Sequence, residues 1–394
     1  MAKTYKFLLI VLICLPISCY FVVRPKKILE EPIISVAVLW DTDTIYISSN
    51  NYLTLTNQDR ITNIPVNTLL MVIENQDSIA VLKNNKIILK NASKITLESE
   101  GDISIGYTSK SMTTYHNKIQ IKKGVVHRFP ITHDLTAINI LPIEEYLYGV
   151  VSSEIGEAKE NEFNAIKAQA VCARSYTMSL LGQRKDFDIY GSYLYDQEYK
   201  GTAREYPLAI SAVNETRGEI IQYKNEPILA QYHACCGGRT TSGRYPYLQP
   251  IIDALNHSRH KKPYCQDSPY FEWNIKIGRD SFESTILKLA GISYKFRLNP
   301  KLEINKKTKR VEYFKFKSDK EYKVSAESFR KALNLRSTFF TYKIKNDSIE
   351  IYGHGWGHGI GLCQYGAMAM ARQKISYKSI LKHYYSNIKF FRVY

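Results

Sequence analysis

Acidic residues are scarce in this 394-residue sequence, because 37 Asp and Glu stand against 54 Lys and Arg and leave a formal charge of +17. Such an excess suggests a polyanionic partner, which is nucleic acid, an anionic membrane surface or an acidic polysaccharide. Trp is also rare, with 3 residues against 30 Tyr, and tyrosine suits both stacking on sugars or bases and ordinary β structure. With 44% apolar and 23% charged residues and ordinary Gly and Pro counts, the composition excludes a disordered, collagen-like or polytopic membrane protein.

Several catalytic signatures are absent. The sequence holds no G-x-S-x-G elbow, no P-loop and no H-E-x-x-H, and the glycines of residues 353–361 give no complete G-x-G-x-x-G spacing. Internal repeats and low-complexity tracts are absent too. The length exceeds what one hydrophobic core usually holds, so we expect two domains, or one domain with a large insertion.

An apolar run at residues 7–23 has basic residues on both sides. Its seventeen residues reach the lower limit for a membrane span and exceed the usual core of a signal peptide. The run therefore predicts a membrane anchor, with a lipoprotein signal lipidated at Cys19 as the alternative, although Pro16 stands where such a signal favours Leu or Val. Both alternatives place the protein outside the cytoplasm and attached to the membrane, which argues against a nucleic-acid partner.

The seven cysteines do not define a disulfide framework. Two belong to the apolar run, and an odd number remains: Cys172, Cys235, Cys236, Cys265 and Cys363. A disulfide between Cys236 and Cys265 fits an extracytoplasmic protein, but Cys235 competes for the same partner.

Short β-branched segments separated by turn residues predict a β-rich unit from residue 33 to about 126, with a hairpin at Asn84 and Asn85. A helix is predicted over residues 161–181, with Asn161 as N-cap and Gly182 after its end. Its buried stripe recurs at three- and four-residue steps: Phe163, Ile166, Ala170, Ala173 and Thr177. Residues 275–342 are mixed and basic, without a recognisable motif.

Glycine occupies every second position of residues 353–361, Gly-His-Gly-Trp-Gly-His-Gly-Ile-Gly. In an extended strand, His354, Trp356 and His358 share one face and the other face is bare backbone. That bare face admits a ligand or a neighbouring backbone, or serves only for packing. The two histidines are candidate metal ligands, but no Cys, Asp or Glu nearby completes a set.

Two further segments carry candidate chemistry. Glu154 is a single carboxylate among apolar residues, predicted in a loop before the helix, and desolvation there raises the pKa of a general acid. His233 with Cys235 and Cys236 suggests a Cys/His pair or a zinc site, although adjacent cysteines rarely bind one zinc together. For Glu154 the alternative is an ordinary solvated glutamate, and nothing in the sequence identifies Cys235 or Cys236 as a thiolate.

These segments, in this order, resemble the stage II sporulation protein D family, which includes the amidase enhancers. The matching text is Ser-Glu-Ile at residues 153–155, Ala-Ile-Lys-Ala-Gln-Ala-Val-Cys-Ala-Arg-Ser-Tyr at 165–176, Tyr-His-Ala-Cys-Cys-Gly-Gly-Arg-Thr at 232–240, and His-Gly-Trp-Gly-His-Gly-Ile-Gly-Leu-Cys-Gln-Tyr-Gly-Ala at 354–367. Tyr-Leu at 247–248 and Ser-Pro-Tyr at 268–270 also match. The resemblance covers about residues 130 to 394.

The resemblance implies a lytic transglycosylase that cleaves peptidoglycan glycan strands, preferably strands stripped of stem peptides. It implies catalytic roles for Glu154, although Ile155 replaces the family's Met, and for Arg174 and Tyr270, although two extra residues separate Glu154 from Arg174. Substrate-binding residues are expected within the matched segments: Gln169, His233, His354, Trp356, His358, Gln364 and Tyr365. Some members bind zinc through Cys and His in the stretch matched by residues 190–201, but tyrosines and Asp196 stand there, so no metal and no cofactor is expected.

Together these observations predict an α+β protein. An anchor or lipoprotein signal (1–28) precedes a β-rich domain (29–128) and a mixed α/β catalytic domain of the sporulation protein D type (129–394). The expected partners are glycan strands, whose lactyl carboxylates make them polyanions, and the membrane through the N-terminus. A cell-wall amidase is a further partner if the chain is a non-catalytic, glycan-binding activator, and a structural bridge in an envelope complex is the third alternative.

Overall fold

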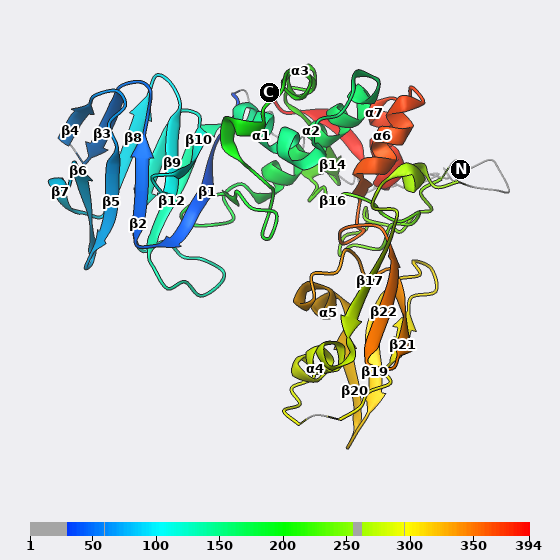
Figure 1. Ribbon diagram of the computed structural model, residues 1–394. Helices are drawn as coiled ribbons and strands as arrows, with labels where there is room; N and C mark the ends of the chain where they lie inside the picture. Colours follow the sequence, from blue (N-terminus) through cyan, green and yellow to red (C-terminus); the bar gives the residue numbers. More distant parts are fainter. Residues whose placement is uncertain (1–29, 59, 255–261, 295) are drawn as a thin grey trace, which may run out of the picture.

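The computed structural model describes residues 30–58, 60–254, 262–294 and 296–394, and it combines helices and strands as expected (Figure 1). The predicted anchor or lipoprotein signal lies outside the described residues. Within the described ranges, no helix is both long enough and apolar enough to cross a membrane.

The N-terminal part is built from two sheets, as the β-rich prediction required (Figure 1). One has the strand order β13 (Ile189–Tyr190), β1 (Ile33–Thr42), β12 (Leu135–Pro142), β11 (Lys118–Lys122), β8 (Lys94–Ser99), β3 (Leu53–Asn57) and β4 (Arg60–Ile64). The other has the order β10 (Ser111–Tyr115), β9 (Ile103–Thr108), β2 (Thr44–Ser48), β5 (Leu70–Asn75), β6 (Ser78–Lys83) and β7 (Lys86–Ala92). β12 and β13 belong to this first sheet, so the sheet includes residues beyond position 128, where the β-rich domain was expected to end.

The predicted hairpin at Asn84 and Asn85 is confirmed, since it joins β6 to β7. Both asparagines have positive φ, 51° and 58°, which matches the right-handed twist of the paired strands.

A helical layer follows, with α2 (Phe163–Leu180) at its centre in contact with α1, α3, α6 and α7. The other helices are α1 (Ile143–Ile155), α3 (Pro207–Glu215), α6 (Gln364–Arg372) and α7 (Tyr377–Tyr384), with the short 3-10 turns η1 (Glu160–Glu162), η2 (Gly201–Arg204) and η3 (Tyr264–Asp267). Two small sheets complete it, β15 (Glu226–Pro227) with β14 (Glu219–Tyr223) and β24 (Lys389–Arg392), and β16 (Tyr232–His233) parallel to β23 (Leu362–Cys363).

The predicted helix at residues 161–181 is confirmed in type, but its start is not. A 3-10 turn occupies residues 160–162, so Glu162 rather than Asn161 precedes the first helical residue, without a side-chain capping bond. Ile166, Ala170 and Thr177 of the predicted stripe are fully buried. Small residues on the remaining faces are buried as well, because α2 is surrounded by other helices.

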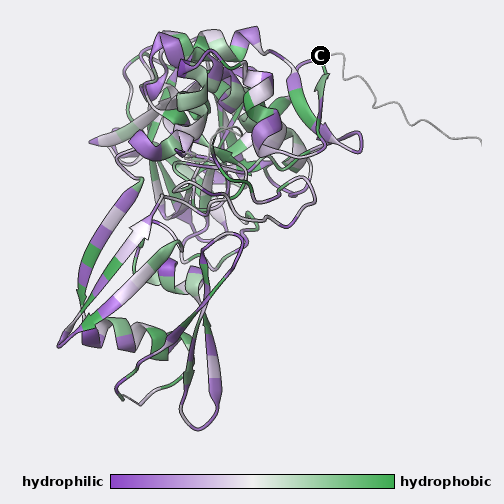
Figure 2. Ribbon diagram, turned by 90° about the vertical axis from the view of Figure 1, so that its right-hand side faces the viewer, coloured by the Kyte–Doolittle hydropathy of each residue, from purple (hydrophilic) through white to green (hydrophobic). Residues whose placement is uncertain are grey.

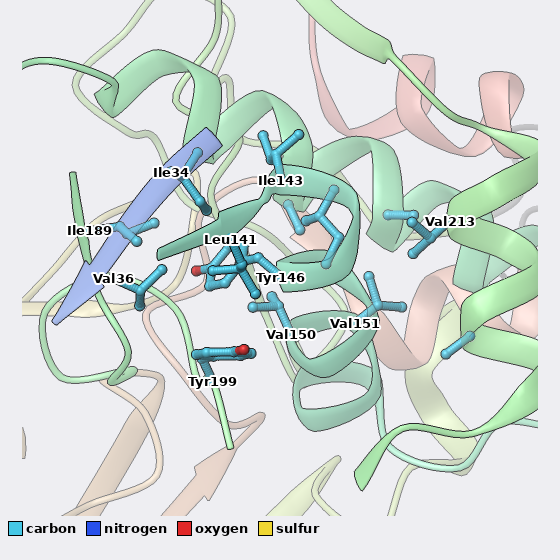
Figure 3. Packing of buried hydrophobic residues seen from close by; sticks show 14 of the residues in the cluster. Ile34, Val36, Leu141, Ile143, Tyr146, Val150, Val151, Ile189, Tyr199 and Val213 are labelled. Atoms are coloured by element: carbon cyan, nitrogen blue, oxygen red, sulfur yellow. The ribbon is translucent and has the colours of Figure 1, made fainter. Parts of the chain in front are cut away.

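The β-rich part and the helical layer share one continuous hydrophobic core. Figure 3 shows Ile34 and Val36 of β1 and Leu141 of β12 packed beside Tyr146 and Val150 of α1. Since α1 begins directly after β12, the sheet holds the start of this helix in place.

Residues 272–354 form a third part with a hydrophobic core of its own, around Phe282, Phe314 and Phe329. It projects from the helical layer (Figure 1), and hydrophilic and hydrophobic residues alternate along its strands (Figure 2). Its elements are β17 (Glu272–Gly278), α4 (Arg279–Leu289), β18 (Lys301–Ile304), β19 (Val311–Lys317), β20 (Glu321–Ser325), α5 (Ala326–Ala332), β21 (Phe340–Lys345) and β22 (Ser348–His354).

Candidate active site

Glu154 lies in the last turn of α1, which corrects the expectation of a loop. The helix is favoured at its start by two acidic residues in the first turn, Glu144 and Glu145, which complement the helix dipole. It stops at Gly156, whose φ of 69° no longer fits a right-handed helix. The carboxyl group is therefore presented from the end of a rigid, buried element.

The Glu154 carboxyl group is partly buried and makes specific hydrogen bonds. Its Oε1 accepts a hydrogen bond of 2.7 Å from the backbone N–H of Glu198, and the hydroxyl of Tyr232 is a second hydrogen-bonding neighbour. Burial raises the pKa of Glu154 to about 7, although these two hydrogen bonds oppose the rise; the nearby charge of Glu198 adds to it. Near neutral pH the group can therefore both donate and accept a proton.

Two glutamines from different helices meet at Glu154. Gln364, at the start of α6, donates from Nε2 to the backbone oxygen of Glu154 at 3.0 Å and to Oε1 of Gln169 on α2 at 3.3 Å. The Nε2 of Gln169 and the Oγ of Ser153 are buried without a hydrogen-bond partner in the described chain. The structure thus brings Gln169 and Gln364 to Glu154 and leaves unused polar groups beside it.

An aromatic platform, defined as Tyr270, Trp356 and Tyr365, adjoins this network through Tyr365, the residue after Gln364. The Tyr270 ring lies 4.4 Å from Trp356 and 5.6 Å from Tyr365, centroid to centroid. Trp356 is 42% exposed, so part of the platform faces solvent. The guanidinium of Arg336 lies 5.5 Å from the ring centroids of both Tyr270 and Trp356, which places a cation at the platform.

Arg174 lies away from Glu154. It is fully buried on α2 and forms an ion pair with Glu144, Nη2 to Oε2 at 2.6 Å. It also donates to the backbone oxygens of Val213 and Glu219. Glu144 is ten residues before Glu154 on the same helix, a separation of about 15 Å along the axis.

The glycine-rich segment is a winding loop, so the prediction of an extended strand there is wrong. β22 ends at His354, and the following glycines have positive φ, for example 105° at Gly357 and 78° at Gly359. A Cβ on Gly359 would sit 2.4 Å from the guanidinium of Arg310. The glycines are therefore required by backbone conformation and by close contacts, not by a bare strand face.

The three predicted histidines do not converge on one point. His233 is buried, its Nδ1 contacts the Ile360 oxygen at 3.1 Å, and its ring lies 5.6 Å from that of His358. Burial lowers the pKa of His233 and that of His358, the latter to about 4. His354 lies apart, 3.9 Å from Glu272 and against Phe339.

Residues 190–201, the stretch for which the resemblance implied a comparison with zinc ligands, are held by contacts of Asp196. Asp196 accepts the backbone N–H of Tyr190 and forms an ion pair with Arg184 at 2.9 Å. Tyr190 and Tyr195 pack with Trp40 in an aromatic cluster.

Sequence reasoning missed several residues of this site. Tyr232 lies in a matched segment, directly before the predicted His233, but its hydroxyl accepts from Gln197 at 2.9 Å and adjoins Glu154. Glu198 acts through a backbone N–H, for which side-chain patterns give no signal. Arg336 comes from the basic stretch that carried no motif.

Comparison with known proteins gives consistent matches. The family model described as Stage II sporulation protein matches residues 132–223, which include Glu154, Gln169 and Arg174. The chain is 30% identical over 334 residues to an uncharacterized protein of Brachyspira hyodysenteriae, covering 82% of each chain. It is 28% identical to Stage II sporulation protein D of Bacillus subtilis, covering 63% of this chain and 74% of the relative. It is also 29% identical to the Amidase enhancer of Bacillus subtilis, covering 61% of this chain and 39% of that protein.

Proposed function

This chain belongs to the stage II sporulation protein D family, and on that premise we propose that it is a cell-wall enzyme, a lytic transglycosylase acting on peptidoglycan glycan strands. The observation that carries the proposal is the environment of Glu154. A carboxyl group with a pKa of about 7, held at a helix end beside unused polar groups, suits proton transfer to a glycosidic oxygen.

The proposed reaction needs one carboxyl group in two successive roles. Glu154 protonates the glycosidic oxygen as the bond to the anomeric carbon breaks. The C6 hydroxyl of the same muramic acid then attacks that carbon, and Glu154 accepts its proton, which leaves a 1,6-anhydro end and restores the acid. Hydrolases differ because they use a second carboxylate and a water molecule.

A second carboxylate does lie close to Glu154, namely Glu198. Its Oε1 is paired with Lys200 at 2.8 Å, and its Oε2 accepts the backbone N–H of Tyr193. These partners occupy both carboxylate oxygens of Glu198. We infer that Glu198 orients Glu154 through its backbone N–H rather than activating water.

The aromatic platform supports strand binding. Aromatic rings such as the exposed Trp356 offer an apolar face for sugar rings, and Arg336 offers a cation for the lactyl carboxylate of muramic acid. The overall charge of +17 favours the same polyanionic strand. We place the substrate across the platform, with the bond to be cleaved at Glu154.

The experiment compares the chain with its Glu154→Gln variant on sacculi from which an amidase has removed the stem peptides. Mass spectrometry of the products distinguishes the mechanisms, because transglycosylation leaves anhydro ends and hydrolysis leaves reducing ends. Glu198→Gln should still give anhydro ends. Since the proton donor must be protonated, activity should fall as the pH rises through about 7.

The relative named Amidase enhancer supports a second candidate, a non-catalytic activator that binds glycan and stimulates a cell-wall amidase. Stimulated amidase activity without new glycan ends, unchanged in Glu154→Gln, would select this function over the enzyme.

A further inference from the structure

Four buried side chains converge beside the glycine-rich loop, outside the candidate active site. Cys236 follows β16, Cys265 lies in η3, Cys363 ends β23, and Asp253 comes from the segment between Cys236 and η3. Their sulfur and carboxylate oxygen atoms all lie within 4.8 Å of one another, and each residue is at most 1% exposed. We call these residues the cysteine cluster.

The cysteine cluster contains the carboxylate of Asp253, and burying a charged carboxylate costs free energy unless its charge is compensated. Asp253 is fully buried and faces Cys236, whose Sγ is 3.1 Å from Oδ2. Its other oxygen, Oδ1, accepts from the hydroxyl of Tyr384 at 2.7 Å and lies 3.5 Å from Nε2 of His383. A divalent cation among the thiolates would compensate the charge that Oδ2 presents to the cluster.

The surroundings of the sulfurs resemble the second layer of a metal centre. The Sγ of Cys363 accepts the backbone N–H of Cys236 at 3.2 Å and that of Gly366 at 3.4 Å. A Cβ on Gly366 would meet the Tyr384 hydroxyl at 2.1 Å and Asp253 Oδ2 at 2.7 Å, so only glycine leaves this space open. Ligand atoms of metal centres are oriented by such hydrogen bonds.

We propose that the cysteine cluster is a structural zinc site, with the thiolates of Cys236, Cys265 and Cys363 and one oxygen of Asp253 as a tetrahedral ligand set. Zinc takes thiolate and carboxylate ligands in this geometry, with zinc–sulfur distances of about 2.3 Å, so two bound sulfurs lie about 3.8 Å apart. The sulfurs of Cys236 and Cys265 are 3.4 Å apart, close to that spacing. A disulfide between these two would use only two of the four groups.

The site would fasten Asp253 and η3 to Cys236, which follows β16, and to Cys363, which precedes α6. β16 carries Tyr232 and pairs with β23, and β23 is followed directly by Gln364. Tyr232 and Gln364 both adjoin Glu154. Zinc would therefore stabilise the two strands that position Tyr232 and Gln364 at the candidate active site. The expectation of no metal was based on residues 190–201, which lie in a different part of the fold.

The test measures metal directly and does not depend on glycan cleavage. The full chain is purified without chelator or reductant, its zinc is counted by elemental mass spectrometry, and its cysteine pairing is mapped on peptides alkylated before reduction. If zinc is absent, Zn²⁺ or Co²⁺ is added under argon to the reduced protein. We expect one Zn²⁺ per chain, Cys236, Cys265 and Cys363 alkylated as thiols, and a cobalt derivative with thiolate charge-transfer absorption.

Cys265→Ser should bind Zn²⁺ at least about tenfold more weakly and lower the Tm. Cys172→Ser is the matched control, because Cys172 is also a buried thiol but its contact is the Tyr385 hydroxyl at 3.3 Å. A disulfide in the isolated protein between Cys265 and either Cys236 or Cys235 would overturn the proposal. So would a chain that takes up no Zn²⁺ after reduction, or a Cys265→Ser variant that binds it as tightly as the parent.

Discussion

The ionisation of Glu154 should make the folded protein less stable as the pH rises, and Glu154→Gln should remove this effect. The pKa of Glu154 is raised from 4.5 to about 7 by burial, so the folded state holds a proton that the unfolded state releases between these values. The stability contributed by this proton is fully present below about pH 4.5 and is lost as the pH rises through 7. At about 1.4 kcal/mol per pKa unit, the loss reaches at most about 3.5 kcal/mol.

The assay is urea unfolding of the chain and of Glu154→Gln across this range. Near pH 4 the two should be equally stable, whereas near pH 8 the variant should be more stable by up to about 3.5 kcal/mol. Glu157→Gln is the control for the Glu-to-Gln change itself, since Glu157 is exposed two residues beyond the helix. If the advantage of Glu154→Gln does not grow with pH, Glu154 is an ordinary solvated carboxylate and the argument for a neutral-pH acid fails.

Three further substitutions test other parts of the structure. Arg174→Met should cost about 3–5 kcal/mol in urea unfolding, because it leaves Glu144 buried without its cation; a stable but inactive variant would instead give Arg174 a catalytic role. Trp356→Ala should weaken binding of stripped glycan about tenfold in a pull-down titration. Tyr352→Ala is the control, because Tyr352 lies on β22 and is equally exposed, and it should leave binding unchanged. Equal effects of the two substitutions would show that the aromatic platform does not bind glycan. Gly359→Val should lower the Tm strongly in thermal unfolding, since φ is 78° and the space is filled; an unchanged Tm would contradict the loop conformation.

Local patterns in the sequence were sufficient for part of the regular structure, but not for the end of α1 or for the elements of residues 272–354. The strands before residue 126, the asparagine hairpin and the helix α2 follow from alternation, turn chemistry and helical spacing. The start of α2 was missed because a 3-10 turn takes the place of a side-chain cap. The glycine segment was missed because alternation alone does not distinguish an extended strand from a loop with positive φ.

Glu154 was predictable as a candidate, but its surroundings depend on contacts between distant segments. Gln364 reaches Glu154 across 210 positions of the chain, and the Glu198 contact uses a backbone N–H. The assignment of Arg174 to catalysis came from a matched position, whereas its ion pair with Glu144 appears only once α1 and α2 are packed. Cys363 and Asp253 likewise join Cys236 and Cys265 only in three dimensions.

The role proposed for Glu154 is catalysis of the cleavage of glycan strands to anhydro ends. The most direct measurement is mass spectrometry of the fragments released from amidase-treated sacculi by the chain and by Glu154→Gln. We predict 1,6-anhydromuramic ends with the chain and a loss of at least about a hundredfold in their rate of formation with the variant. Reducing ends in place of anhydro ends, or equal cleavage by the variant, would contradict it.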